Sequence, residues 1–299
     1  MHPRHDLLAG LSLAILGLAG VAGAADNGPF DLVLRGGRIV DGTGNPWFRG
    51  DVAIRGDRIV AVGRLDEREI AAARRVVDAT GRVVAPGFID MHAHSDRTLL
   101  LDGSAPSKVR QGVTTEVLGE QTSGGPNAGT LGPREVTVAG RPRPIRSLAD
   151  YLDALEDGGI AVNAATYVGL GNVWGGVMGT SFSRPTAEQR ARMEAILAEA
   201  LEDGAFGLSD ALASPDAAAV TTDDLVALGR VVGRYGGIYS THIRNEGGAV
   251  FEAIGEAIAV GERAGMPVEI FHLKVAYRPG WGVLMDSVRR VVDAARARG

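Results

Sequence analysis

Hydrophobic and polar residues alternate in short stretches over the first part of the chain, from Phe30 to about Gly81. Asp51–Ile54 and Arg58–Val62 alternate on either side of the turn residues Arg55-Gly56-Asp57, a pattern typical of a β-hairpin. Further alternating stretches lie before and after this hairpin. The pattern predicts a small β layer that is too short to form a stable sheet on its own.

Beyond Pro86-Gly87, short apolar stretches alternate with longer segments of helical periodicity. Such repeated strand–helix units predict an α/β fold with a parallel sheet, either open or closed into a barrel. The segment Gly124–Pro144, rich in Gly, Pro and Arg, is predicted to be a long loop. The predicted strands are Gly87–His92, Val113–Gly119, Ile160–Gly169, Ala205–Ser209, Gly237–Ile243 and Pro267–His272, and the predicted helices are Ala149–Glu156, Thr186–Asp203, Thr222–Tyr235, Phe251–Ala264 and Met285–Arg298.

The N-terminus has the pattern of a secretory leader. Arg4 precedes an apolar run from Leu7 to Val21, and Ala22-Gly23-Ala24 supplies the small residues of a cleavage site. A signal peptide over residues 1–24 would direct the mature protein to the periplasm or the exterior. A single membrane anchor is the alternative, although the run is short for a span. After leader removal, no segment is expected to cross a membrane.

Composition narrows the chemistry of any functional site. The 299 residues carry a formal net charge of -5, and this mildly acidic balance argues against nucleic acid as a partner. Cysteine is absent, which excludes disulfides and thiolate ligands. A metal site in this chain would have to use histidine and carboxylate ligands.

The histidines outside the predicted leader share one position in the predicted fold. Of the 6 in the chain, His2 and His5 fall in the leader, and each of the others lies at the C-terminal end of a predicted strand. The two-residue spacing of the His-x-His pair places both imidazoles on one face of an extended strand. The C-terminal rim of a parallel barrel is where functional side chains gather, and zinc prefers neutral imidazoles. A single histidine at a strand end is more often a structural hydrogen-bond donor, but the shared placement predicts a metal site formed by His92, His94, His242 and His272.

Several segments, taken in order, resemble one protein family. The sequence is similar to the N-acyl-D-amino-acid deacylase (D-aminoacylase) family of the amidohydrolase superfamily, in an apparently C-terminally truncated form. The His-x-His strand is shared across the superfamily, whereas the Thr-His-Ile-Arg-Asn-Glu and His-Leu-Lys segments are more particular to the deacylases. The segments that carry the resemblance are Asp31–Gly44, Val84–Asp96, Gly112–Pro126, Gly236–Gly247, Val268–Lys274 and Pro279–Gly282.

The resemblance implies a (β/α)8 metallo-dependent hydrolase barrel with a small β-sandwich. Residues 25–82 would form the N-terminal part of the sandwich, and 83–299 would form an incomplete barrel with about six of its eight units. One or two zinc ions are implied, with His242 and His272 as ligands of the main ion and His92 and His94 as ligands of a second. Many relatives bridge the ions through a cysteine. Glu120 is the nearest replacement here, and Gln121 is the adjacent alternative.

The resemblance also implies a reaction. A zinc-bound hydroxide would hydrolyse the amide bond of an N-acyl-D-amino acid, while Lys274 and Arg244 hold the substrate carboxylate. Alternatively, Arg244 and Glu246 form an ordinary surface ion pair. The acid–base aspartate would lie beyond Gly299, so no catalytic residue of this kind is expected in the chain, which is expected to lack normal catalysis. Other possible functions are a cyclic-amide hydrolase, an isoaspartyl-type dipeptidase, or a non-catalytic zinc-binding fragment.

Overall fold

The computed structural model describes residues 28–181 and 183–299, and the leader predicted over residues 1–24 lies outside this part. The described residues up to Pro86 form one compact unit, and Gly87–Gly299 form a second. Within the described residues, no helix combines the length and the apolar character needed to cross a bilayer.

The first unit is a small sheet with the strand order β3-β2-β1-β4, in which β5 also pairs with β1. The predicted hairpin is confirmed, because β2 and β3 pair antiparallel up to the Arg55–Arg58 pair across the turn. A small apolar core of Val33, Ala53 and Ile70 supports the sheet. The strands are β1 (Leu32–Ile39), β2 (Phe48–Arg55), β3 (Arg58–Gly63), β4 (Val76–Asp78) and β5 (Val83–Val84).

A short helix, α1 (Glu67–Ala72), interrupts the segment that was expected to contain only strands and turns. Asp66 caps the helix by accepting from the Arg68 backbone amide, and the Glu69 side chain accepts from the Asp66 amide in return. This capping box satisfies backbone donors that have no partner inside the helix. The Asp-x-x-Glu pattern at residues 66–69 is the signal that the prediction missed.

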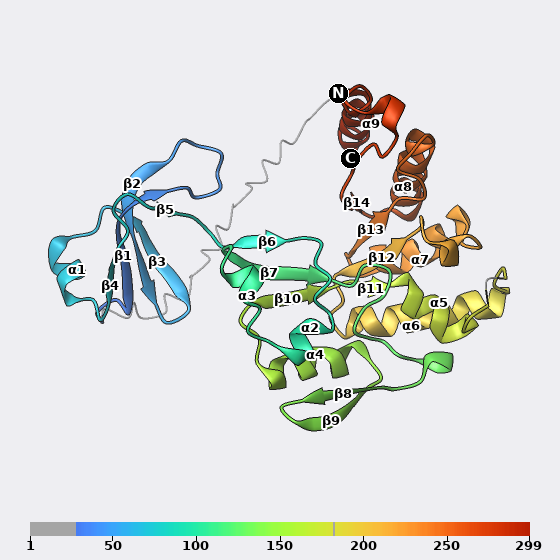
Figure 1. Cartoon of the computed structure of the whole chain (residues 1–299), viewed down its shortest axis with the longest axis horizontal. Helices are drawn as coiled ribbons and strands as arrows, with labels where there is room; N and C mark the ends of the chain where they lie inside the picture. Colours follow the sequence, from blue (N-terminus) through green and yellow to red (C-terminus); the bar gives the residue numbers. More distant parts are fainter. Residues whose placement is uncertain (1–27, 182) are drawn as a thin grey trace, which may run out of the picture. The chain divides into compact units, whose positions relative to one another are not determined.

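The second unit contains a row of parallel strands that follows the order of the chain (Figure 1). Two hydrogen-bonded sheets make up the row, β10-β7-β6 and β11-β12-β13-β14. Tyr167 alone separates β10 from β11, and the Phe206 amide donates to the Thr166 carbonyl where the two sheets meet. The strands are β6 (Phe88–Asp90), β7 (Val113–Leu118), β10 (Asn163–Thr166), β11 (Val168–Gly169), β12 (Gly207–Ala211), β13 (Ile238–His242) and β14 (Val268–Ile270).

Helices alternate with these strands, so the α/β class predicted from the sequence is confirmed. All six predicted strand segments contain observed strands, and the five predicted helices are present with ends shifted by a few residues. Ser147, Thr186 and Thr221 each cap a helix through a capping box. The helices are α2 (Thr98–Leu101), α3 (Pro106–Val109), α4 (Leu148–Gly158), α5 (Leu170–Met178), α6 (Ala187–Glu202), α7 (Thr222–Arg234), α8 (Val250–Ala264) and α9 (Met285–Arg296).

Two elements depart from the prediction. The segment predicted as a long loop contains an antiparallel hairpin of β8 (Arg134–Val138) and β9 (Arg141–Ile145), with Ala139 and Gly140 at its turn. Alternating Val136, Val138 and Ile145 contribute apolar contacts to the core, which the Gly, Pro and Arg content of the segment had obscured. The helix α5 was also missed, because its glycines give it a weak intrinsic helix preference.

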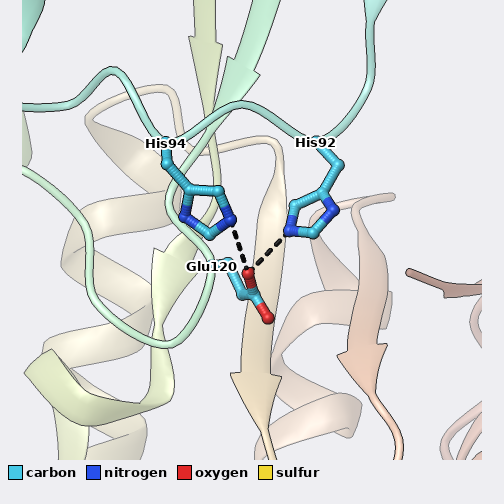
Figure 2. Close-up of side chains that lie close together, drawn as sticks. All are labelled: His92, His94 and Glu120. Atoms are coloured by element: carbon cyan, nitrogen blue, oxygen red, sulfur yellow. Dashed lines mark hydrogen bonds and ion pairs between the residues drawn. The ribbon is translucent and has the colours of Figure 1, made fainter. Parts of the chain in front are cut away.

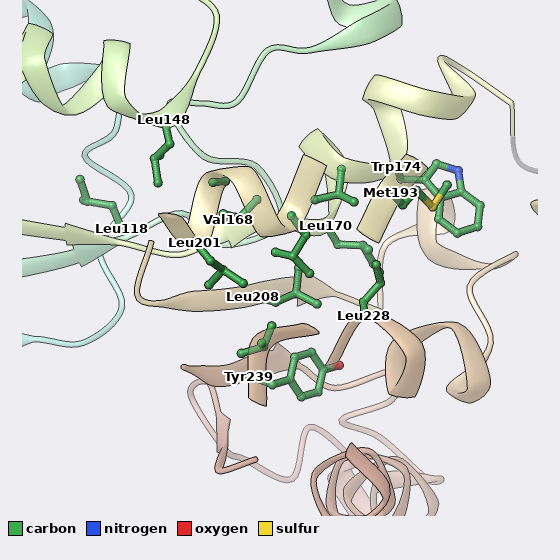
Figure 3. Close-up of a cluster of buried hydrophobic side chains, with 14 of the residues drawn as sticks. Leu118, Leu148, Val168, Leu170, Trp174, Met193, Leu201, Leu208, Leu228 and Tyr239 are labelled. Carbon is green, nitrogen blue, oxygen red and sulfur yellow. The ribbon is translucent and has the colours of Figure 1, made fainter. Parts of the chain in front are cut away.

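The main apolar core lies between the strand row and the helices of the second unit (Figure 3). Leu208 on β12 and Leu228 on α7 are fully buried there. Complete burial of such a side chain contributes about 1.5–3 kcal/mol relative to exposure. This core fixes the strand ends from which the candidate site is built.

Candidate metal centre

Five predicted site residues meet at the C-terminal ends of the parallel strands. His92 and His94 follow β6, His242 ends β13, and His272 follows β14, while Glu120 lies two residues past the end of β7. We call these residues the rim cluster. Figure 2 shows His92 and His94 turned toward the Glu120 carboxylate, as their spacing on an extended strand predicts.

Each oxygen of the Glu120 carboxylate faces a different pair of imidazoles. Oε2 lies 2.6 Å from His92 Nε2 and 3.0 Å from His94 Nε2. Oε1 lies 3.2 Å from His242 Nδ1 and 4.0 Å from His272 Nε2. The Glu120 carboxylate therefore lies between two pairs of imidazole nitrogens, and each pair could ligate a metal ion.

Backbone geometry at the end of β7 selects Glu120 over its neighbour. Gly119 has a φ of 95°, and a Cβ there would lie 2.5 Å from the Tyr167 carbonyl oxygen, so only glycine permits this close approach. Gln121, with a φ of 56°, turns away, and its Oε1 accepts from the Ala211 amide at 2.8 Å. The register left open by the sequence thus places Glu120, and not Gln121, in the rim cluster.

Packing fixes the imidazole rings. The His92 ring stacks on Phe271 with centroids 4.3 Å apart, and the His242 and His272 rings meet edge to face at 4.4 Å. His272 adopts a left-handed backbone with a φ of 34°. Residues other than glycine rarely occupy this region, and when they do they often lie at functional sites.

The surroundings shift the pKa values of two members of the rim cluster, His272 and Glu120. Burial lowers the pKa of His272 below its ordinary value, and the neighbouring Lys274 ammonium lowers it further. Burial would raise the pKa of Glu120, but hydrogen bonds from His92 and His242 reverse this effect, so the pKa is lowered overall. The Glu120 side chain is only 9% exposed, whereas His94 is 67% exposed, so the cluster is reached from solvent on the His94 side.

The cluster contains two overlapping groups of metal-ligand type. His92, His94 and Glu120 form one group, and Glu120, His242 and His272 form the other, with the ligand atoms of each group within 4.8 Å of one another. Imidazole nitrogen and carboxylate oxygen are ligands that zinc accepts, and each group supplies three of the four ligands of a tetrahedral zinc site. The arrangement is chemically suited to one or two divalent ions that share Glu120.

The structure brings Lys274 to the edge of this cluster. Its Nζ donates to the Glu246 carboxylate and lies 2.9 Å from His272 Nδ1. Glu246 itself has Oε1 at 2.9 Å from His272 Nδ1 and 3.6 Å from His242 Nε2. The motif predicted no role for Glu246 at the site, although this residue lies only four positions after His242.

Arg244 does not reach the rim cluster. Its Nε and Nη2 donate to Glu256 on α8 at 2.9 and 3.0 Å, and Nη2 also donates to the Val220 carbonyl at 3.1 Å. Arg244 therefore forms an ion pair with Glu256. The alternative prediction of an Arg244–Glu246 ion pair is wrong.

Buried side chains beside Arg244 complete a second polar group. Asp210 on β12 accepts from the Tyr239 hydroxyl at 2.5 Å and from the Thr241 hydroxyl at 2.6 Å. Burial raises the pKa of Asp210 to about 7, against the lowering effect of these two hydrogen bonds. We call Asp210, Tyr239, Thr241, Arg244 and Glu256 the anchoring network.

The model of the amidohydrolase family matches residues 75–294, which include the whole rim cluster. The chain belongs to the amidohydrolase family. It is 39% identical over 277 residues to the D-aminoacylase of Alcaligenes xylosoxydans xylosoxydans, a match that covers 92% of this chain and 56% of the relative. This amidohydrolase chain therefore spans a little more than half the length of such relatives.

Solved structures agree with this family membership. A D-aminoacylase described as having a binuclear metal centre matches with a TM-score of 0.81 and 36% identity, over 90% of this chain and 56% of that one. The N-acyl-D-glutamate deacylase of Bordetella bronchiseptica, complexed with zinc and a phosphonate inhibitor, matches with a TM-score of 0.82 and 33% identity, over 91% of this chain and 57% of that one.

Proposed function

We propose that this amidohydrolase is a zinc-dependent enzyme that hydrolyses the amide bond of N-acyl-D-amino acids. The observation that carries the proposal is the convergence of His92, His94, His242 and His272 on the Glu120 carboxylate. The similarity to D-aminoacylases supports the substrate class. We further propose that the parallel strand row corresponds to part of a (β/α)8 barrel.

The residues present fit a zinc site without cysteine. His242, His272 and Glu120 would hold the main ion, and His92 and His94 would hold a second ion with Glu120 as the shared ligand. When bound, zinc supplies Lewis-acid polarisation of the scissile carbonyl and lowers the pKa of water. The chain contributes the Glu120 carboxylate, whose pKa is lowered by hydrogen bonds from His92 and His242, and the imidazole of His272, whose pKa is lowered by burial and by Lys274.

Lys274 is the residue of this chain that we assign to the substrate carboxylate. Its side chain is 47% exposed and its ammonium lies beside the rim cluster, so it can meet an anion entering from solvent. Arg244, in contrast, directs its donors to Glu256 and a backbone carbonyl. An incoming carboxylate would have to displace these partners, so the proposal places the substrate on Lys274.

Zinc titration and hydrolysis assays test the proposal separately. Zinc binding is measured by calorimetry, and hydrolysis is compared for N-acetyl-D-amino acids, their L-enantiomers, a cyclic amide and a β-aspartyl dipeptide. We expect the chain to bind zinc, and we expect hydrolysis with a preference for the D series from the protein purified from its own cells. Preference for the cyclic amide or the β-aspartyl substrate would replace the deacylase with the corresponding enzyme of the superfamily. Zinc binding with no hydrolysis would favour a non-catalytic zinc-binding protein, and the absence of zinc binding would contradict the whole proposal.

We also propose that the protein is exported to the periplasm or the exterior. The leader pattern over residues 1–24 supports this, with a small-residue cleavage site at Ala22–Ala24. N-terminal sequencing of the protein from its own cells tests the proposal, and a mature start near Ala25 is the expected result. A retained Met1 would contradict it.

A further inference from the structure

The His92 ring is held by two contacts of different kinds. Its Nε2 lies 2.6 Å from Glu120 Oε2, and its face lies on the Phe271 ring, with centroids 4.3 Å apart and planes inclined by 16°. A contact at one nitrogen fixes the place of that nitrogen but leaves the ring free to tilt about it. A face contact restricts this tilt, so the two contacts together define both the position and the plane of the imidazole.

Phe271 is itself fixed by residues of neighbouring strands. It follows β14 directly, is 3% exposed, and packs in one apolar cluster with Val117 on β7 and with Tyr167. The Tyr167 ring meets the Phe271 ring edge to face, with centroids 6.0 Å apart. The Tyr167 hydroxyl donates to Glu269 Oε2 at 2.9 Å, so the tyrosine is held at its hydroxyl as well as by its packing. His92 therefore lies on a buried ring that has little freedom to move.

The other imidazoles of the rim cluster meet Phe271 less closely. The His94 ring is 67% exposed and meets the His92 ring edge to face at 4.8 Å, so its orientation depends on that of His92. The contact of Phe271 with His272 is looser, because their centroids are 6.5 Å apart and their planes are inclined by 42°. Phe271 thus supports the ligand group of His92 and His94 more than the group of His242 and His272.

We propose that Phe271 is a positioning residue that holds the His92 imidazole in the plane in which its Nε2 meets Glu120. The group of His92, His94 and Glu120 is then formed before an ion enters it, so binding does not have to order the His92 ring. This inference rests on the proposed function, because it treats His92 as a ligand of the second ion. It adds that affinity for the second ion depends on a phenyl ring that supplies no ligand atom.

Mobility of the His92 ring is the first readout, and it needs no metal. NMR relaxation of the ring C–H bonds in the 13C-labelled, metal-free chain reports motion on the ps–ns timescale. The His92 signals are assigned from their loss in His92→Asn. We expect an ordered His92 ring in the unmodified chain and in Phe271→Tyr, which keeps an aromatic face. We expect a more mobile ring in Phe271→Leu, which has no flat face, and Phe271→Ile replaces this variant if it does not fold.

Zinc titration by calorimetry is the second readout. We expect Phe271→Leu to weaken binding of the second ion about 2–10-fold, the size of a lost aromatic contact, and to leave the main ion unchanged. Phe271→Tyr should bind both ions as the unmodified chain does. Phe251→Leu on α8 is the matched control, because it makes the same change in a different apolar cluster. It should alter neither ring mobility nor zinc binding. Circular dichroism establishes that each variant is folded.

The two readouts separate failure of this inference from failure of the proposed function. A mobile His92 ring in the unmodified chain, or an equally ordered ring in Phe271→Leu, would overturn the inference whether or not zinc binds. Unchanged zinc binding in Phe271→Leu, or equal losses at both ions, would also overturn it while the proposed metal site stands. If the unmodified chain binds a single ion, ring mobility alone decides the inference. If it binds none, the proposed function fails first.

Discussion

Strand β13 supplies neighbouring residues to two polar regions that differ in how their groups are satisfied. Thr241 donates its hydroxyl to Asp210 in the anchoring network, and the next residue, His242, faces Glu120 in the rim cluster. Successive side chains of a strand point to opposite faces, so one strand end can serve both regions. In the anchoring network, two hydroxyls donate to the Asp210 carboxylate, and the Arg244 guanidinium donates to the Glu256 carboxylate. In the rim cluster, four imidazoles surround one carboxylate.

This difference separates a structural role from a binding role. A carboxylate that already accepts two hydroxyl hydrogen bonds, as Asp210 does, gains little from a further ligand. The imidazoles around Glu120 supply ring nitrogens, which are ligands that zinc accepts. The rim cluster is therefore the region suited to a cation, although both regions are rich in polar side chains. Three experiments test this contrast.

The largest effect is expected from Glu120→Ala, which removes the carboxylate shared by both ligand groups. Loss of an outer partner alone costs about 10–100-fold in metal affinity, so loss of the shared ligand should weaken zinc binding by more than about 100-fold. The matched control is Glu116→Gln on β7, a fully buried carboxylate outside the rim cluster, and it should leave zinc affinity unchanged. Zinc affinity is measured by calorimetry. An equal loss of affinity in Glu120→Ala and Glu116→Gln would contradict the assignment of zinc binding to the rim cluster.

The next effect concerns the pH dependence of stability through Asp210. Its pKa is about 7 in the folded chain against an ordinary value of 3.8. Between these values the folded state holds a proton that the unfolded state has lost, so this residue makes stability fall as pH rises from about 4 to about 7. The loss between pH 5 and pH 8 should be on the order of 2–3 kcal/mol.

Urea unfolding of the metal-free chain and of Asp210→Asn at the two pH values measures this contribution. We expect the variant to lose less stability with rising pH, because Asn does not titrate. The exposed Asp223→Asn is the control. A pH dependence that is the same in the unmodified chain and Asp210→Asn would show that Asp210 is ionised at both pH values.

The smallest effect is expected from Arg244→Met. The change removes the donors to Glu256 and the Val220 carbonyl but keeps much of the apolar stem. We expect a loss of about 1–2 kcal/mol in the free energy of unfolding, because charged hydrogen bonds at a half-buried site are lost. Zinc affinity should not change. A clear loss of zinc binding or of substrate affinity with unchanged stability would show that Arg244 acts in binding and not in the anchoring network.

The sequence predicted the rim cluster well because its signal is local. The His-x-His spacing and the position of each histidine at a strand end follow from strand periodicity, and the structure brings all four rings to one carboxylate. The choice between Glu120 and Gln121 could not be made from periodicity. It depends on the left-handed Gly119 and on the Ala211 amide, which lies 90 residues away from Gln121 in the chain.

The remaining differences have a common physical cause. The direction of Arg244 depends on Glu256, which belongs to the following helix, and the acceptor role of Glu246 depends on a lysine from another strand end. Such pairings are set by tertiary packing, so a motif read along the chain does not reveal them. The missed hairpin β8–β9 also gains its stability from contacts with the core that its composition does not show.

The shared position of Glu120 has a consequence for how the two ligand groups would fill. Each of its oxygens faces a different pair of imidazoles, so both groups draw on the charge of one carboxylate. Two divalent ions held this way repel each other and divide a single negative charge between them. The first ion would then bind more tightly than the second. By thermodynamic reciprocity, each ion would weaken the binding of the other by the same factor, and the centre would fill with negative cooperativity.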